Sequence, residues 1–174
     1  VGIDVGAHVM SGDIADVVKS REGLVVSKGL LKMFEAGYLG KKNKKSYYKY
    51  DGKNGKRNGA NPHAYQFFGN PPKIELAFED MTWRPLLLMI NEAVMCLEEG
   101  ILSTPTDGDL GAVFGLGFLP FTGGPFRFAD AYGISELVKL MEEYAKKFGP
   151  KFNPRPLLAS MAENNQLFHS KNCD

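Results

Sequence analysis

The chain has 174 residues, of which 44% are hydrophobic and 24% are charged, and its formal net charge is +1. This composition provides enough apolar material for one ordinary hydrophobic core and predicts a globular domain. No apolar run approaches the roughly 20 residues that are needed to cross a bilayer, and the first residues lack the pattern of a signal peptide.

The first part of the chain predicts short helices. Residues 1–12 are interrupted by glycine and predict a helix end or a loop. Apolar side chains recur at helical spacing in residues 13–21 and 28–36, and both segments carry capping signals. Because the sequence opens on Val1, within what resembles a regular element, we expect it to be a piece of a longer protein.

The segment 38–50, YLGKKNKKSYYKY, places alternating aromatic residues around a Lys-Asn-Lys-Lys tip and predicts a small β-hairpin. Residues 41–57 contain eight Lys and Arg against the single Asp51, so this segment carries +7 and the rest of the chain −6. Three explanations remain open: a phosphate or nucleic-acid contact with stacking tyrosines, attraction of an acidic nucleotide group such as that of coenzyme A, or a solvated loop. We prefer the solvated loop.

Residues 51–72 are rich in Gly, Asn, Lys and Pro, which predicts a flexible linker that is partly disordered between residues 53 and 61. The linker divides the chain into an N-terminal part, residues 1–50, and a C-terminal helical domain, residues 73–174.

The C-terminal part predicts mainly helices. The strongest periodic pattern covers residues 80–99, with Asp80 as the expected cap, and further helices are predicted at 134–148 and 156–164. The expected fold class is therefore mostly α with one small β-hairpin.

Two polar residues lie in the middle of the helix predicted at 80–99. Glu92 could be a buried general base with a raised pKa. With its neighbour Asn91, it could instead clamp a nearby loop by hydrogen bonds, and we prefer this second explanation.

The apolar, glycine-rich stretch 109–133 predicts two short helices, 109–115 and 125–132, joined by a tight loop. Gly115-Leu116-Gly117 resembles the start of a dinucleotide-binding loop, but Pro120 and the lack of a preceding strand argue against a cofactor loop. Gly123-Gly124 could hold an anion at a helix N-terminus. A close helix-packing turn explains these glycines equally well and is the preferred interpretation.

Cysteine and histidine positions indicate no metal or disulfide framework. Cys96 is expected to be a small core residue and Cys173 a tail thiol. His8, His63 and His169 lack the spacing of metal ligands, so we expect no structural metal.

Three segments occur in an order that resembles one enzyme family: NEAVMCLEEGI at 91–101, DLGAVFGLGF at 109–118 and GGPFRFADAYG at 123–133. They resemble the C-terminal helical domain of 3-hydroxyacyl-CoA dehydrogenases, and among these the α subunits of the mitochondrial trifunctional enzyme of fatty acid β-oxidation. Residues 1–9 and 38–50 resemble the end of a first copy of this domain and its connecting hairpin.

The resemblance implies a parent enzyme in which an upstream Rossmann domain binds NAD and supplies a catalytic His and Glu. It also implies an enoyl-CoA hydratase activity in the parent and a mitochondrial location, in the matrix or at the inner membrane. This chain departs from the family at two places: Trp83 precedes Arg84 where the catalytic copy has Asn, and residues 44–48 replace a GKGFY pattern. We therefore expect no catalytic, cofactor-binding or metal-binding residues in this chain.

The expected function is a non-catalytic helical packing fragment of an NAD-dependent 3-hydroxyacyl-CoA dehydrogenase. Its expected partners are the upstream Rossmann and first helical domains, with acyl-CoA bound by the parent and no nucleic acid. Apart from its parent, the fragment could self-associate through the apolar faces of helices 80–99 and 134–148. The alternative is a free-standing binding module that uses the basic hairpin, residues 41–57, for nucleic acid or an acidic surface.

Overall fold

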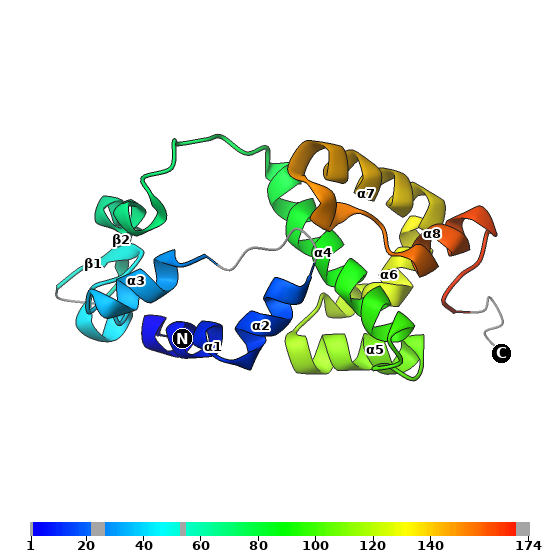
Figure 1. Cartoon of the computed structure of the whole chain (residues 1–174), viewed down its shortest axis with the longest axis horizontal. Coiled ribbons are helices and arrows are strands. Elements are labelled where there is room, and N and C mark those ends of the chain that lie inside the picture. Colours follow the sequence, from blue (N-terminus) through cyan, green and yellow to red (C-terminus); the bar gives the residue numbers. More distant parts are fainter. Residues whose placement is uncertain (1, 22–26, 53–54, 170–174) are drawn as a thin grey trace. The chain divides into compact units, whose positions relative to one another are not determined.

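The computed structural model describes residues 2–21, 27–52 and 55–169 (Figure 1). The chain divides into two compact units, unit 1 at Val1–Glu75 and unit 2 at Leu76–Asp174. The boundary falls close to residue 73, where the sequence predicts the second helical domain to begin. The identification of unit 1 as the end of a first helical domain stays a prediction.

Unit 1 contains three short helices: α1 (Ile3–Ser11), α2 (Asp13–Ser20) and α3 (Gly29–Glu35). Within residues 1–12, predicted as a helix end or loop, Ile3–Ser11 thus form a helix of their own, because Ile3 and Ala7 lie four residues apart and bury the same face. The small core of unit 1 joins this face to Met33 of α3 and to Ala64.

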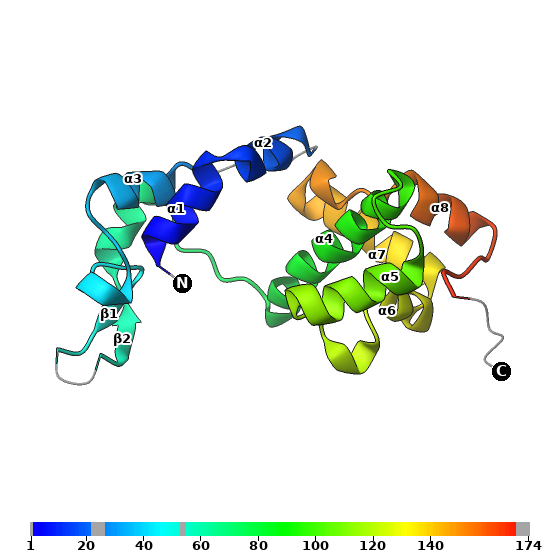
Figure 2. The ribbon, with the colours of Figure 1, turned by 90° about the horizontal axis from the view of Figure 1, so that it is seen from below.

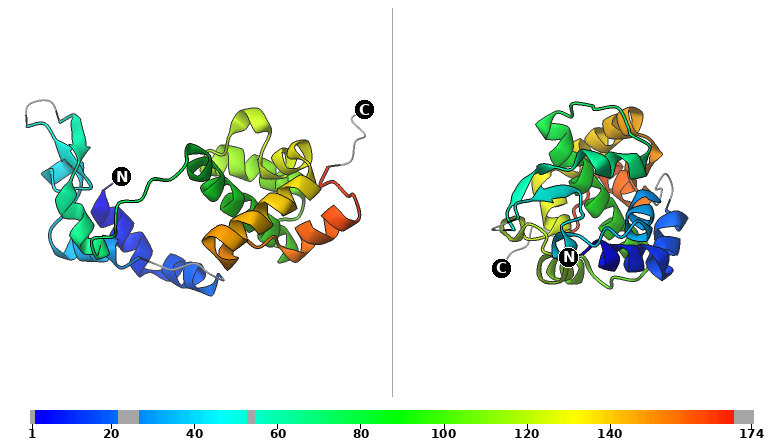
Figure 3. Two further views of the ribbon diagram at one scale, coloured as in Figure 1. Left: turned by 90° about the horizontal axis from the view of Figure 1, so that it is seen from above. Right: turned by 90° about the vertical axis from the view of Figure 1, so that its left-hand side faces the viewer.

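The β-hairpin of unit 1 pairs β1 (Tyr48–Tyr50) with β2 (Arg57–Ala60) in antiparallel orientation, and it projects from the helices of the unit (Figure 3). The predicted turn at the lysine-rich tip is a separate, smaller feature that an isolated bridge between Gly40 and Lys45 closes. The Asn43 side chain stabilises this small turn, because its oxygen accepts hydrogen bonds from the backbone N–H groups of Leu39 and Lys45.

Regular structure extends into the segment 51–72 for which the sequence predicts a flexible linker. Strand β2 and a 3₁₀ helix at Pro62–Phe68 both lie within it. Asn61 links them, because its side chain accepts from the His63 N–H at 3.2 Å and donates to the Ser46 carbonyl at 2.9 Å. Part of the predicted disorder, at residues 53 and 54, lies outside the described residues.

Unit 2 is a bundle of helices, and the predicted helices of this half are confirmed. They are α4 (Phe78–Glu98), α5 (Pro105–Gly111), α6 (Pro125–Tyr132), α7 (Ile134–Phe148) and α8 (Pro156–Glu163). A π-helical turn at Ala112–Leu116 continues α5, and short 3₁₀ helices occupy Pro120–Thr122 and Pro150–Phe152. Among the described residues, no helix is both long and apolar enough to span a membrane.

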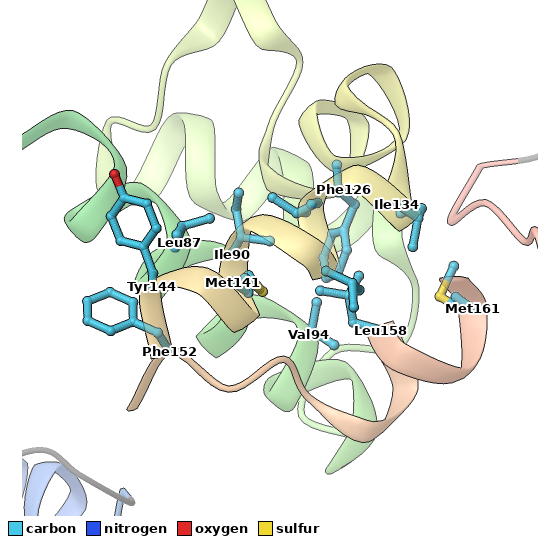
Figure 4. Packing of buried hydrophobic residues seen from close by; sticks show 13 residues of the cluster. Leu87, Ile90, Val94, Phe126, Ile134, Met141, Tyr144, Phe152, Leu158 and Met161 are labelled. Atoms are coloured by element: carbon cyan, nitrogen blue, oxygen red, sulfur yellow. The ribbon is translucent and has the colours of Figure 1, made fainter. Parts of the chain in front are cut away.

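The core of unit 2 forms where α4, α6, α7 and α8 present their apolar faces to one another (Figure 4). Each fully buried large side chain contributes about 1.5–3 kcal/mol by leaving water. The central members of this core are Leu87, Ile90, Val94, Phe126, Leu137, Met141, Phe152 and Leu158. The apolar faces of the two longest helices of the unit, α4 and α7, are therefore buried inside it.

Asp80 has a different role from the helix cap that the sequence predicts. Helix α4 begins two residues earlier, with Ala77 at the N-cap position, and Asp80 lies buried within its first turn. Its carboxylate accepts hydrogen bonds from Lys147 Nζ at 2.7 and 2.9 Å and from the Tyr144 hydroxyl at 3.1 Å. The start of α4 is thereby tied to the end of α7.

These contacts shift the pKa values of both Asp80 and Tyr144. The hydrogen bond from Lys147 holds the pKa of Asp80 below its usual value, although burial opposes this shift. Burial, followed by the hydrogen bond to Asp80, raises the pKa of Tyr144 to about 12. Because the pKa of Asp80 is lower in the folded state, the ionised carboxylate stabilises the fold above the unfolded pKa of about 4. This contribution is lost as the pH falls through the lower folded pKa.

We predict that Asp80→Asn makes unit 2 less stable at pH 7 but reduces its loss of stability between pH 6 and pH 2.5. The test is the midpoint of urea unfolding, followed by the fluorescence of Trp83, which is the single tryptophan of the chain and lies in α4. Glu142→Gln removes an exposed carboxylate from α7 and serves as the control. Identical acid sensitivity of the wild type and Asp80→Asn would contradict the assignment.

Candidate functional site

A buried carboxylate lies at the centre of the glycine-rich stretch. Asp109, near the end of α5, is only 3% exposed. Its Oδ1 accepts from the Phe126 N–H at 2.8 Å and, at 3.5 Å, from the Arg127 N–H. These two donors belong to the first turn of α6, whose N-terminal amides attract negative charge. The chain's own carboxylate thus occupies the anion position that the sequence suggested near Gly123-Gly124.

Two glycines allow α5 and α6 to approach this closely. Gly124 has φ = +118°, and a Cβ atom there would lie 2.3 Å from Asp109 Oδ1. A Cβ atom on Gly108 would lie 2.4 Å from the ring of Phe126. Both distances are too short for real Cβ atoms, so the predicted role of the glycines at 123–124 as a close packing turn is confirmed.

The C-terminal segment closes the same site. His169 Nε2 lies 2.8 Å from Asp109 Oδ2, and the backbone N–H groups of Phe168 and His169 both donate to Asp130 at 2.9 Å. The ring of Phe168 packs edge-on against Phe126, with the centroids 4.8 Å apart. This function of His169 could not be predicted from the sequence, because no spacing rule connects residues 60 positions apart.

An exposed apolar segment follows the buried carboxylate along the chain. We call residues 110–121 the apolar segment; in it, Phe114 and Phe121 are each 84% exposed and Leu116 is 77% exposed. Buried Phe118 anchors the segment, and its N–H donates to the Ala112 carbonyl at 2.9 Å. The loop that joins α5 to α6, yellow-green in the ribbon, projects from the other helices of unit 2 (Figure 2; Figure 3, left).

The Gly115-Leu116-Gly117 sequence lies within the apolar segment, at the end of the π-helical turn. Gly117 adopts the left-handed conformation with φ = +73° and terminates this turn. The glycines therefore end a helical element, whereas a dinucleotide-binding loop leads from a strand into a helix.

A second polar cluster ties α4 to the start of α8. The Asn91 side chain donates to the Asn153 carbonyl at 2.8 Å and accepts from the Arg155 N–H at 3.0 Å. Glu98 accepts from the Leu157 N–H and from Arg155 Nε, both at 2.7 Å. The predicted clamp is confirmed for Asn91, and Glu98 is a second member of it that no sequence pattern indicated.

Glu92 lies on the exposed side of α4, so it is not the buried carboxylate that the sequence allowed as a general base. The side chains in the middle and at the end of this helix that bind the loop before α8 belong to Asn91 and Glu98. They bind backbone groups of a neighbouring loop, which is a structural role.

Trp83 belongs to an aromatic cluster between α4 and α6. Its ring centroid lies 5.2 Å from that of Tyr132 and 6.2 Å from that of Phe128. The neighbouring Arg84 places its guanidinium 4.8 Å from the centroid of the Phe148 ring. Trp83, which stands where the resemblance implies an Asn in the catalytic copy, is therefore part of the packing of the unit.

The remaining candidate residues are dispersed. Cys96 is half-buried in α4, and His8 and His63 are exposed in unit 1. Cys173 lies outside the described residues. Within the described part of the chain, no three His, Cys, Asp or Glu side chains come together in a way that could hold a metal ion.

The charged side chains of the basic segment, residues 41–57, make different contacts. Lys42 pairs with Asp4, and Lys44 Nζ donates to the Gly52 carbonyl at 3.2 Å. The hydrogen bond from Lys42 lowers the pKa of Asp4. Three other cations of the segment, Lys41, Lys56 and Arg57, line one pocket of unit 1.

Comparison with known proteins gives a family match for residues 81–172. This region matches the sequence model described as "3-hydroxyacyl-CoA dehydrogenase, C-terminal domain". The chain is 38% identical over 169 residues to the fatty acid oxidation complex subunit alpha of Vibrio vulnificus, and 38% identical over 172 residues to that of Shewanella halifaxensis. These alignments cover 97% and 98% of this chain but 23% of each relative.

The predicted mitochondrial location is wrong. The similar proteins come from Vibrio and Shewanella, which are bacteria and have no mitochondria. The three quoted segments support membership of the dehydrogenase family, whereas nothing in them distinguishes an organelle enzyme from a bacterial one.

We predict that Gly124→Ala destabilises unit 2 by at least about 3 kcal/mol, because it combines a strained backbone with a collision against Asp109. Urea unfolding followed by Trp83 fluorescence measures this loss. Gly115→Ala is the matched control, since a Cβ atom there meets nothing within 4 Å. We expect its effect to stay within about 0.5 kcal/mol. Equal stability of the two variants would contradict the close-packing role of Gly124.

Proposed function

Because the chain belongs to the 3-hydroxyacyl-CoA dehydrogenase C-terminal-domain family, we propose that it is a non-catalytic packing unit of such a dehydrogenase in fatty acid β-oxidation. The relatives bear the name fatty acid oxidation complex subunit alpha, and the chain spans about a quarter of their length. On this proposal, catalysis by the whole protein depends on other domains, and this chain stabilises and orients them.

Trp83 supports the non-catalytic role. The resemblance to the family assigns this position, directly before Arg84, to an Asn in the catalytic copy. An indole ring offers a single N–H donor and no group that titrates near neutral pH, so it cannot replace an amide that accepts and donates hydrogen bonds. The packing of Trp83 against Tyr132 and Phe128 gives it a structural function instead.

The observation that carries the packing role is the apolar segment, residues 110–121. Phe114, Leu116 and Phe121 are exposed, although each would lower the free energy of the molecule by leaving water. Contiguous exposed apolar surface of this kind marks interaction sites in folded proteins. The adjacent Asp109 and Gly124 hold the segment to the body of unit 2 and so present it to a partner.

The packing surface proposed here differs from the one expected from the sequence, which lay on the apolar faces of the helices at 80–99 and 134–148. Those faces bury Leu87, Ile90 and Met141 inside unit 2, so they are not available to another domain. Exposed apolar side chains on α1 and α2 of unit 1, including Val5, Ile14 and Val17, are consistent with a helical domain that continues beyond these elements.

We further propose the partners and cofactors of the parent protein. The apolar segment would pack on an upstream Rossmann or first helical domain of the same protein. The redox-active NAD and the acyl group of acyl-CoA would bind to those domains. Oxidation of a 3-hydroxyacyl-CoA with NAD by the purified chain would contradict the non-catalytic assignment.

We predict that the isolated chain self-associates through the apolar segment and that Phe114→Ser combined with Phe121→Ser weakens this association at least tenfold. Burial of one Phe contributes about 1.5–3 kcal/mol, and about 1.4 kcal/mol corresponds to a factor of ten in the dissociation constant. Sedimentation equilibrium over a range of protein concentrations measures the constant.

Phe78→Ser provides the matched control, because Phe78 is 81% exposed but lies outside the apolar segment. This variant should associate like the wild type. A wild-type chain that stays monomeric at all concentrations, or equal weakening by Phe78→Ser, would refute the packing surface.

A further inference from the structure

Two pockets of unit 1 share a wall formed by Tyr47 and Tyr48. The first has a volume of about 630 Å³, and its lining includes the cations Lys41, Lys56 and Arg57. The second has a volume of about 340 Å³ and is lined mainly by apolar and aromatic groups, including Tyr65 and Phe68. A basic pocket thus lies beside an aromatic one, and both volumes fall within the range of about 300–1,000 Å³ typical of small-molecule sites.

The cations of the first pocket are available to a ligand. Lys42 is neutralised by Asp4, but the described residues provide no carboxylate partner for Lys41, Lys56 or Arg57. The Arg57 guanidinium lies 4.6 Å from the centroid of the Tyr48 ring, and this cation–π contact orients it while leaving its N–H groups for other acceptors. The pocket therefore concentrates positive charge that no carboxylate among the described residues neutralises.

The second pocket offers flat apolar surfaces. Tyr47 and Phe68 are in contact, with centroids 6.0 Å apart, and Tyr65 is half exposed beside them. Aromatic side chains of this kind stack on the face of any nucleobase. Burial raises the pKa of the Tyr47 hydroxyl, which keeps this group protonated and able to donate to a phosphate.

We propose that unit 1 binds a nucleoside that carries two or more phosphate charges. Lys41, Lys56 and Arg57 would hold the phosphates in the basic pocket. The base would lie in the adjacent pocket against Tyr65 and Phe68.

The size and lining of the two pockets favour a single nucleotide over a nucleic acid strand. A strand is held by a charged groove that follows its backbone over several nucleotides, so all lysines of the segment would contribute similarly. Here the lining selects particular cations: Lys41, Lys56 and Arg57 belong to the pocket, whereas exposed Lys49 of the same segment does not. This site is independent of the packing role proposed for unit 2.

Isothermal titration calorimetry of the 174-residue chain with adenosine 3′,5′-bisphosphate at low salt tests the proposal. We expect binding of one ligand per chain. Lys56→Gln and Arg57→Gln should each weaken binding at least tenfold, and Lys49→Gln, which removes the same charge from the same segment, should change it less than twofold. Lys56→Gln leaves the Arg57–Tyr48 contact intact, and far-UV circular dichroism checks the fold of each variant.

The Tyr65→Leu variant distinguishes the contribution of the aromatic pocket to binding from that of the basic pocket. It should weaken binding of adenosine 3′,5′-bisphosphate several-fold and leave binding of inorganic pyrophosphate unchanged. ADP serves as a second probe: tighter binding of the bisphosphate indicates recognition of two separate phosphates on the ribose, and tighter binding of ADP indicates recognition of a diphosphate.

Three results would overturn the proposal. The first is the absence of heat from the bisphosphate and ADP at millimolar concentration. The second is equal weakening by Lys49→Gln and Arg57→Gln, which would indicate diffuse attraction. The third is an affinity for single-stranded oligonucleotides that exceeds that for both nucleotides and rises with length, which would indicate a nucleic-acid surface.

Discussion

The structure of unit 2 depends on the carboxylate of Asp109 at the N-terminus of α6. A helix that starts inside a protein needs acceptors for its first N–H groups, and here the acceptor is supplied by the preceding helix. The contact requires the two backbones to approach closely, which only the absence of side chains at Gly108 and Gly124 permits. An unsatisfied amide at this buried position would cost about 1–3 kcal/mol.

The buried contact between Asp109 and the start of α6 also determines where the exposed segment between them leaves the unit. The segment between Asp109 and Gly124 leaves and re-enters the body of the unit at the same point, where the Asp109 carboxylate accepts from the Phe126 N–H. Phe118 packs inward, whereas Phe114, Leu116 and Phe121 remain exposed. The clamp formed by Asn91 and Glu98 similarly fixes the loop before α8 on α4. Hydrogen bonds to backbone groups thus hold the shape of a unit whose proposed role is to pack against other domains.

Local signals explain what could be predicted from the sequence. Helix α7 has the predicted bounds because apolar periodicity and flanking glycines act over a few residues. Contacts over long separations could not be predicted: the partner of Asp80 is 67 residues away, which is why the sequence suggested a local cap, and His169 meets Asp109 across 60 residues. Burial, rather than residue type, excluded Glu92 as a base and selected Glu98 as a clamp.

The central claim is that the chain's own carboxylate, and no external anion, satisfies the start of α6. Amide hydrogen exchange of Phe126 in the wild type and in Asp109→Ala tests this claim most directly. We predict that the Phe126 amide exchanges at least about tenfold faster in the variant, since one net hydrogen bond is worth about 0.5–1.5 kcal/mol and bonds to charged groups more. The amides of α1 in unit 1 should exchange at unchanged rates. Unchanged protection of Phe126 in Asp109→Ala would contradict the account.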